Sequence, residues 1–306
     1  WWMAKVDNSY TSSANRLVIQ ANPGDDVTVE GNFYLRHSNT TIQGLKFYNA
    51  SPNATGEAIG MNINATHNGY LAGIIVQNCE FEGTKPFSFN PGIAFANPEA
   101  DTTFDFALVN NYAHDFLINS EENSGRGKQL TAGNVYDKWN VSNGASGQLF
   151  RPAVTADSVD RYYLNNTCYT TNGRMQGVLE LSDTVNQDYS SVTFANTIIV
   201  QTEPSPWNVQ DTGIRSPANH DNSQPIHPNL ANNMQYGAHL APGGGGYAYE
   251  LGDQYNMTLA EWVTHLALAG QSTPGSSVAD PLFEDAANGG FLLQMDFSPA
   301  IGTGDA

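Results

Sequence analysis

Short strand-like phrases recur along this sequence, and each phrase is interrupted by one residue that tolerates a bend. The six clearest phrases break at Gly44, Asn78, Asn111, Lys138, Asn166 and Asn196. These breaks are separated by roughly 34, 33, 27, 28 and 30 residues. A repeat of that length is typical of solenoids, propellers and other arrays. The phrases are rich in β-branched and aromatic residues and lack helical periodicity, so each predicts two short strands joined at a one-residue corner.

This repeating unit predicts an all-β fold, a single-stranded right-handed parallel β-helix, which is a solenoid with one coil for about every thirty residues. Asn suits the corner because it tolerates the left-handed backbone conformation. Its amide can also bond to the same amide in the next coil, about 4.8 Å away. We expect a single domain over residues 1–306. A third strand of the coil is expected at 58–64, 91–97, 115–120, 147–152 and 177–182.

Residues 203–275 differ in composition, because Pro, Gly, Asn and Ser are frequent there. They predict an irregular, loop-rich excursion from the solenoid rather than a second core. One helix is expected within it: Thr258 and Glu261 form a capping box, and Gly270 ends the helix. The apolar face of this helix is expected to pack on the solenoid and consists of Leu259, Trp262, Val263, Leu266 and Ala267.

The C-terminal stretch resembles the closing coils of secreted right-handed parallel β-helix proteins. In those proteins an Asp-Pro-x-Phe phrase leads to a short strand and then to Ser-Pro-Ala-Ile-Gly, and here the phrases are Asp280 to Phe283 and Ser298 to Gly302. The resemblance implies a β-helix and a secreted or cell-surface location. It implies no particular activity, because many catalytic and non-catalytic proteins share this fold.

The charge of the chain limits its partners. The formal net charge is −18 and the pI is about 4.5. A field of that sign repels nucleic acid and anionic membrane surfaces, and it also disfavours long-range steering of anionic polysaccharides. No run of apolar residues reaches the length of a membrane span. We therefore expect no nucleic-acid partner and no membrane span.

The two cysteines are predicted to be free thiols in the core. Cys79 follows its corner by one residue and Cys168 follows its corner by two, so their side chains should point to different faces. They also lie three coils apart, roughly 14 Å by the strand spacing. That separation exceeds the reach of a disulfide.

The expected third strands carry the candidate functional residues. A parallel β-helix lines up one strand from every coil, and an elongated ligand such as a polysaccharide can lie along the resulting row. Glu121, Arg151 and Asp183 are about thirty residues apart and are expected in adjacent coils. The candidate substrate-binding residues are Asn119, Gln148 and Arg174.

The phrases "NSEENSGRGK" and "GQLFRP" resemble the alginate lyase and chondroitinase B family of β-helix polysaccharide lyases. In that family, acidic residues bind Ca²⁺, a lysine acts as base and an arginine follows on the next coil. The resemblance implies Glu121 and Glu122 as Ca²⁺ ligands, and Lys128 and Arg151 as the catalytic pair. Such a set would neutralise a uronate carboxylate, remove its neighbouring carbon-bound proton and assist the leaving oxygen.

A second interpretation uses carboxylates alone, since glycoside hydrolysis needs two of them. The candidates are Glu121, Glu180 and Asp183. Two coils separate Glu121 from Asp183, roughly 10 Å by the strand spacing. That separation favours an inverting geometry.

The sequence therefore predicts a secreted, polysaccharide-interacting protein that cleaves its ligand by β-elimination or hydrolysis. One alternative is a non-catalytic adhesin, sheath or filament subunit. Its coils would stack end to end, because the first residues contain no obvious cap for a β-helix and a neighbouring subunit can cover that end. A non-catalytic carbohydrate-binding module is the other alternative. Whether the chain is an enzyme stays open at this point.

Overall fold

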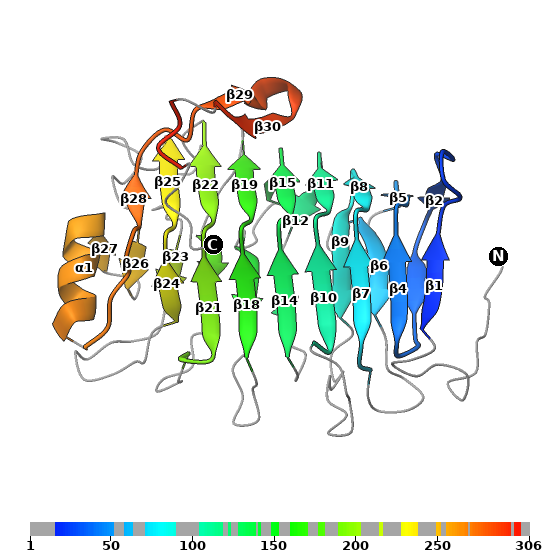
Figure 1. The fold of residues 1–306 in the computed structure, drawn as a ribbon, viewed down its shortest axis with the longest axis horizontal. Helices are drawn as coiled ribbons and strands as arrows, with labels where there is room; N and C mark the ends of the chain where they lie inside the picture. Colours follow the sequence, from blue (N-terminus) through cyan, green and yellow to red (C-terminus); the bar gives the residue numbers. More distant parts are fainter. Residues whose placement is uncertain are drawn as a thin grey trace.

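A computed structural model of the chain describes most of the repeating strands and the C-terminal region. The described residues are 16–51, 58–63, 71–89, 104–118, 122–123, 128–138, 140–141, 148–152, 160–170, 177–180, 189–202, 214–216, 228–237, 249–251, 255–268, 270–294 and 297–300. Within this part of the chain, parallel sheets stacked side by side dominate, with one α-helix at the end far from β1 (Figure 1). The all-β class is confirmed, and the stacked parallel sheets are compatible with the predicted β-helix.

Two long parallel sheets form most of the structure. The eight-stranded sheet consists of β1 (Leu17–Gln20), β4 (Thr40–Gln43), β7 (Ile74–Gln77), β10 (Phe106–Val109), β14 (Gln129–Ala132), β18 (Arg161–Leu164), β21 (Val192–Ala195) and β24 (Asn229–Ala231). The nine-stranded sheet consists of β2 (Thr28–Glu30), β5 (Lys46–Tyr48), β8 (Glu80–Glu82), β11 (Tyr112–His114), β15 (Val135–Asp137), β19 (Thr167–Thr170), β22 (Ile198–Gln201), β25 (Met234–Gly237) and β28 (Ser277–Val278). Each strand pairs with the equivalent strand of the next repeat.

The third side of the repeat is formed by shorter sheets. A three-stranded sheet contains β3 (Phe33–Leu35), β6 (Ile59–Ile63) and β9 (Lys85–Phe89). A six-stranded sheet contains β13 (Glu122–Asn123), β17 (Gln148–Pro152), β20 (Gly177–Glu180), β23 (Ile214–Ser216), β26 (Tyr249–Leu251) and the antiparallel β27 (Tyr255–Met257). A separate pair is formed by β12 (Leu117–Ile118) and β16 (Asn140–Val141). Strands β9 and β13 are in contact, so the six-stranded sheet follows the three-stranded sheet along the third side of the molecule.

Three of the five predicted third strands coincide with observed ones. The ranges 58–64, 147–152 and 177–182 contain β6, β17 and β20. The range 91–97 lies outside the described residues, and β9 begins earlier, at Lys85. The range 115–120 contains only the two residues of β12.

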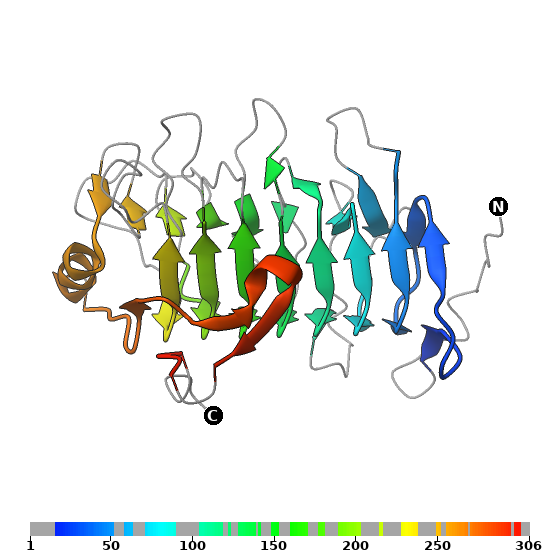
Figure 2. The same cartoon turned by 90° about the horizontal axis from the view of Figure 1, so that it is seen from above.

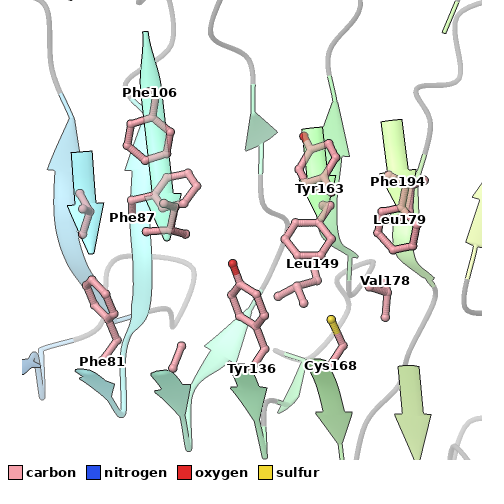
Figure 3. Packing of buried hydrophobic residues seen from close by; sticks show 14 of the residues in the cluster. Phe81, Phe87, Phe106, Tyr136, Leu149, Tyr163, Cys168, Val178, Leu179 and Phe194 are labelled. Atoms are coloured by element: carbon pink, nitrogen blue, oxygen red, sulfur yellow. The ribbon is translucent and has the colours of Figure 1, made fainter. Parts of the chain in front are cut away.

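In strands such as β7, β14 and β18, the side chains of the interior alternate with more exposed ones. In the nine-stranded sheet, the middle residues Phe47, Phe81, Ala113 and Tyr136 are buried. Figure 3 shows Phe81 and Tyr136 in the same interior as Leu149 and Phe194, which come from the other two sides. One cluster of buried apolar side chains extends from Leu35 to Leu266.

From β4 onward, each corner between the eight-stranded and the nine-stranded sheet has a residue with a left-handed backbone. The corner residues are Gly44, Asn78, Asn110, Gly133, Asn165, Asn196 and Asn232, with φ between 52° and 67°. The predicted corners at Gly44, Asn78 and Asn196 are confirmed. The predicted corners at Asn111 and Asn166 are wrong by one residue, and Lys138, whose φ is 50°, occupies the next corner, after β15. The corner φ suits Gly and Asn because other side chains clash there.

The asparagines that follow three of these corners form an internal ladder. Asn111 Nδ2 donates to Asn134 Oδ1 at 2.9 Å, and Asn134 Nδ2 donates to Asn166 Oδ1 at 3.2 Å. Their Nδ2 groups also donate to the carbonyls of Val76, Leu108 and Thr131. The predicted amide stacking therefore exists, but its members are the buried residues after the corners and not the corner residues themselves.

The predicted helix is α1 (Leu259–Leu268). Its capping box is confirmed, because Glu261 N donates to Thr258 Oγ1 at 3.3 Å and Thr258 N donates to Glu261 Oε2 at 2.8 Å. Gly270 follows with a φ of 71°. Trp262 and Leu266 are buried, whereas Val263 and Ala267 of the predicted face are exposed. The buried face is therefore narrower than the sequence pattern suggests.

The C-terminal phrases form an antiparallel hairpin that lies over the nine-stranded sheet (Figure 2). It consists of β29 (Phe283–Asp285), a short 3₁₀ helix (Ala286–Asn288) and β30 (Gly290–Leu293). Ser298 Oγ donates to the Pro281 carbonyl and accepts a bond from Ala300 N. The Asp-Pro and Ser-Pro-Ala phrases are thus tied together by one buried hydroxyl.

Both cysteines are buried free thiols, as predicted. Burial raises the pKa of Cys79 to about 11, and burial also raises the pKa of Cys168. Across the described segments, no helix has both the length and the apolar character that a bilayer span requires.

Candidate functional site

The six-stranded sheet aligns acidic and basic residues in one row. The backbone register pairs Glu122 of β13 with Arg151 of β17. The register of β17 with β20 pairs Gln148 with Gly177 and Phe150 with Leu179, so the same offset brings Arg151 beside Glu180. Glu180 pairs in turn with Arg215, and Arg215 pairs with Glu250. We call Glu122, Arg151, Glu180, Arg215 and Glu250 the charge row.

The charge row includes part of the predicted site. Glu122 and not Glu121 is the register partner of Arg151, and Glu180 stands at the next position instead of Asp183. Gln148 lies on the same strand as Arg151. The remaining predicted residues, Asn119, Glu121, Arg174 and Asp183, lie outside the described part of the chain.

Lys128, the predicted base, lies directly before β14 of the eight-stranded sheet. Its ammonium lies 5.5 Å from the ring centre of Phe104 and 5.7 Å from that of Tyr162. It also lies 3.9 Å from an Asp160 carboxylate oxygen. These contacts are two cation–π interactions and one partly exposed ion pair. The register of the six-stranded sheet does not include Lys128, so its catalytic role stays a prediction.

A second cluster, which the sequence analysis did not identify, lies on the outer face of the nine-stranded sheet. Lys46, Glu80 and Tyr112 are register partners on β5, β8 and β11. Glu82, His114 and Asp137 are register partners on β8, β11 and β15. Because the residues between them point inward, these six side chains share the outer face. We call them the outer cluster.

Charged contacts connect four residues of the outer cluster, which are Lys46, Glu80, Glu82 and His114. Lys46 Nζ lies 3.0 Å from Glu80 Oε1 and also contacts Glu82 Oε2. His114 Nε2 lies 3.1 Å from the same Glu80 oxygen. The other ring nitrogen, Nδ1, lies 2.7 Å from Asp115 Oδ2. His114 therefore bridges two carboxylates, and Glu80 is shared by a lysine and a histidine.

The remaining contacts of the outer cluster join two half-buried rings, Tyr112 and His114, to the buried Asp137. The Tyr112 ring stacks on the His114 ring at 4.6 Å, and the Tyr112 hydroxyl donates to Asp137 Oδ2 at 3.0 Å. Asp137 is 0% exposed, and its Oδ1 has no hydrogen-bond partner among the described residues. The Lys138 ammonium lies 3.7 Å from Asp137 Oδ2. An ionised carboxylate in this position is only partly compensated.

The surroundings shift the pKa values of the two acids in opposite directions. Burial raises the pKa of Asp137, and this outweighs the hydrogen bond from Tyr112. Burial alone would raise the pKa of Glu80, but the interactions with His114 and Lys46 together lower it. Hydrogen bonds to Glu82 and Glu80 raise the pKa of Lys46. The neighbours of Glu80 thus favour its ionised form, whereas burial disfavours the ionised form of Asp137.

The C-terminal hairpin forms one wall of the outer cluster (Figure 2). Phe291 packs against Tyr169 at 5.3 Å, and Tyr169 is the register partner of Asp137 on the far side from His114. A side chain at Gly289 would come within 3.0 Å of the Tyr112 hydroxyl. The hairpin therefore shields the Asp137 side of the cluster, while Lys46 and Glu80 remain partly exposed.

The outer cluster has a sequence signal that depends on the correct corners. Counting from the observed corners Gly44, Asn78, Asn110 and Gly133, the fourth residues are Tyr48, Glu82, His114 and Asp137. The sequence analysis placed one corner at Asn111 instead of Asn110 and another at Lys138 instead of Gly133. When positions are counted from these predicted corners, the four residues no longer align. The error in the corner position therefore hid the cluster.

A scan against protein-family models and a search of the curated proteins found no match for this chain. Functional inference consequently rests on the geometry and chemistry of its own residues.

Proposed function

We propose that this protein is a secreted or cell-surface right-handed parallel β-helix that binds a polysaccharide along its six-stranded sheet and cleaves it. The charge row is the observation that carries the proposal. Five charged residues alternate in sign over neighbouring strands, and four strand spacings extend over about 19 Å. A linear row of that length suits an elongated ligand better than a compact one.

The arginines of the row suit an acidic sugar. A guanidinium binds a carboxylate through two parallel hydrogen bonds, and it stays charged at all relevant pH values. Arg151 and Arg215 stand two strands apart, so they would contact two successive parts of one chain. The overall charge of −18 opposes the approach of a polyanion, so recognition would depend on these local arginines.

Two reaction types are consistent with the row. In β-elimination, Arg151 would neutralise the uronate carboxylate, and the resemblance to the lyase family adds Lys128 as base and Ca²⁺ at Glu121 and Glu122. In hydrolysis, Glu122 and Glu180 would be the carboxylate pair. They stand two strands apart, about 9.6 Å by the strand spacing, which is close to the separation in inverting glycosidases.

The test is incubation of the full chain with a panel of uronate-containing and neutral polysaccharides, with Ca²⁺ or with a chelator. Ultraviolet absorbance of unsaturated ends and new reducing ends are followed together. Arg151→Ala is the diagnostic variant, and Arg36→Ala, which alters an arginine that lies over the Tyr34 ring, is the matched control. We expect both signals on a uronate polymer, lost in Arg151→Ala and unchanged in Arg36→Ala.

Each other outcome has a defined meaning. Reducing ends without unsaturated ends would assign hydrolysis to the Glu122 and Glu180 pair. Retarded migration in polysaccharide-containing native gels without any product, weakened by Arg151→Ala, would indicate a non-catalytic binding module. If no polysaccharide of the panel is bound and none is cleaved, the proposal is contradicted. Ordered fibres in the electron microscope would then favour the structural alternative.

A further inference from the structure

The outer cluster contains three side chains whose ligand atoms converge. One oxygen each of Glu80 and Glu82 and one ring nitrogen of His114 all lie within 4.8 Å of one another. In a tetrahedral site with bonds of about 2.0–2.2 Å, neighbouring ligand atoms are roughly 3.4 Å apart. His114 Nε2 and Glu80 Oε1 are already 3.1 Å apart. A small movement of the Glu82 carboxylate would complete a three-ligand set.

A positive charge already occupies the position where the two carboxylates converge. The Lys46 ammonium contacts both Glu80 and Glu82 there. Its side chain is 28% exposed, and its flexible stem can carry the ammonium outward into solvent. Its departure would leave two carboxylates and an imidazole around a position accessible to water, which is the arrangement of an open metal site.

His114 has the orientation of a metal ligand. Histidines that bind metals usually donate their second ring N–H to a carboxylate, which fixes the tautomer and the ring. Here Nδ1 lies 2.7 Å from Asp115 Oδ2, and the ring is stacked on Tyr112. When Nδ1 of the neutral ring donates to Asp115, Nε2 keeps a lone pair that faces Glu80 Oε1, and a cation between these two atoms would bind both. Without a cation there, the protonated ring donates to both carboxylates.

A buried carboxylate on the next strand provides a second reason to expect a positive ligand. Asp137 is the register partner of His114, is 0% exposed and has an Oδ1 without a hydrogen-bond partner in the described part of the chain. Its other oxygen is bonded by Tyr112, whose ring stacks on His114. When this carboxylate is ionised, its negative charge on the strand next to His114 adds to the attraction of a cation bound at the imidazole.

We propose that Glu80, Glu82 and His114 bind a divalent first-row transition-metal ion such as Zn²⁺, and that Lys46 holds the cation position when the metal is absent. The mixed nitrogen and oxygen ligands favour such ions over Ca²⁺, which takes six to eight oxygen ligands. This site is on the nine-stranded sheet, so it is independent of the polysaccharide proposal for the six-stranded sheet.

The test uses the metal-free, untagged full chain. Zn²⁺ is titrated by calorimetry, and Co²⁺ is followed by its visible absorption. We expect one equivalent of Zn²⁺ to bind, with at least tenfold weaker binding in Glu82→Gln and in His114→Gln. Lys46→Met removes the competing ammonium and keeps the stem, so it should bind Zn²⁺ at least tenfold more tightly. His265→Gln, in α1, is the matched control and should bind as the wild type does.

A second measurement protects the test against variants that fail to fold. In the wild-type protein, Zn²⁺ should protect His114 from diethyl pyrocarbonate, as read by mass spectrometry, while His265 stays reactive. Excess Ca²⁺ should give no such protection. Absence of binding in both the wild type and Lys46→Met would overturn the proposal, and so would Zn²⁺ uptake that leaves His114 fully reactive.

Discussion

At the scale of single residues, adjacent asparagines have different roles. Asn165 is exposed, with a φ of 56°, and turns the chain between two sheets. Asn166 is buried, accepts bonds from Asn134 N and Nδ2, and donates to the Thr131 carbonyl at 3.0 Å. The first role needs a permissive backbone, and the second needs an amide side chain.

This pair gives a matched test of the ladder. Asn166→Ala removes the side-chain acceptor of Asn134 N and the side-chain donor to the Thr131 carbonyl, so we expect a loss of about 2–3 kcal/mol in the free energy of unfolding. Asn165→Gly keeps the left-handed corner accessible and should change stability by less than about 1 kcal/mol. Urea denaturation followed by circular dichroism measures both values. Equal losses in the two variants would show that the amide ladder does not stabilise the fold.

The buried Asp137 carboxyl predicts a pH-dependent difference between variants. Burial raises its folded-state pKa above the unfolded value, so its contribution to stability is complete below the unfolded pKa and falls as pH rises through the folded pKa. Asp137→Asn removes this titration and keeps an acceptor for Tyr112. We expect the variant to match the wild type near pH 3 and to be the more stable protein at pH 7. Urea midpoints at the two pH values measure the difference, and a wild type that is more stable at pH 7 would contradict it.

Sequence reasoning at this scale succeeded where the chemistry is local. The capping residues of α1 bond to one another within one turn, so Thr258 and Glu261 could be assigned directly. The corner at Asn110–Asn111 could not, because both residues are Asn and only the stacking with Asn134 decides which one turns inward. The outer cluster could not be identified from the predicted corners, because its residues align only when positions are counted from the observed corners.

At the scale of elements, the start of α1 is a self-contained test. Thr258→Ala removes the hydroxyl that accepts from Glu261 N at 3.3 Å, and we expect a cost of about 1 kcal/mol in the free energy of unfolding. Thr264→Ala is the control, because its hydroxyl bonds only to the Ala260 carbonyl on the exposed helix surface. Thermal melts and urea curves compare the two variants, and a control as costly as the cap change would refute the capping role.

The sheets were predictable as elements, and their arrangement followed from the repeat. Short runs such as 74–77 and 80–82 carry the strand signal, and their spacing indicates which runs pair. The C-terminal hairpin was less predictable. Its packing depends on Phe291 meeting Tyr169, which is 122 positions earlier (291 − 169), and no local pattern encodes that contact. The position of the C-terminal hairpin beside the outer cluster could therefore not be predicted from the sequence.

At the scale of the whole molecule, one core connects all the repeats. The buried apolar cluster includes Cys79, which follows the corner after β7, and Cys168 of β19, which Figure 3 labels. Repeat proteins unfold as coupled neighbours, and the coupling depends on the interfaces between repeats. The stacked register and the amide ladder from Asn111 to Asn166 provide such interfaces between the two cysteines.

The two thiols therefore report on whether the molecule unfolds as a unit. Burial prevents reagent access and raises the pKa of Cys79 to about 11, which lowers its thiolate fraction at neutral pH. We expect both native thiols to react with a chromogenic disulfide far more slowly than in urea-unfolded protein. We also expect Cys79→Ser and Cys168→Ser to become reactive at the same urea concentration, because each variant leaves one reporter in a different repeat. Separate midpoints would show that the repeats near one cysteine open first, and the continuous core would then not make unfolding cooperative.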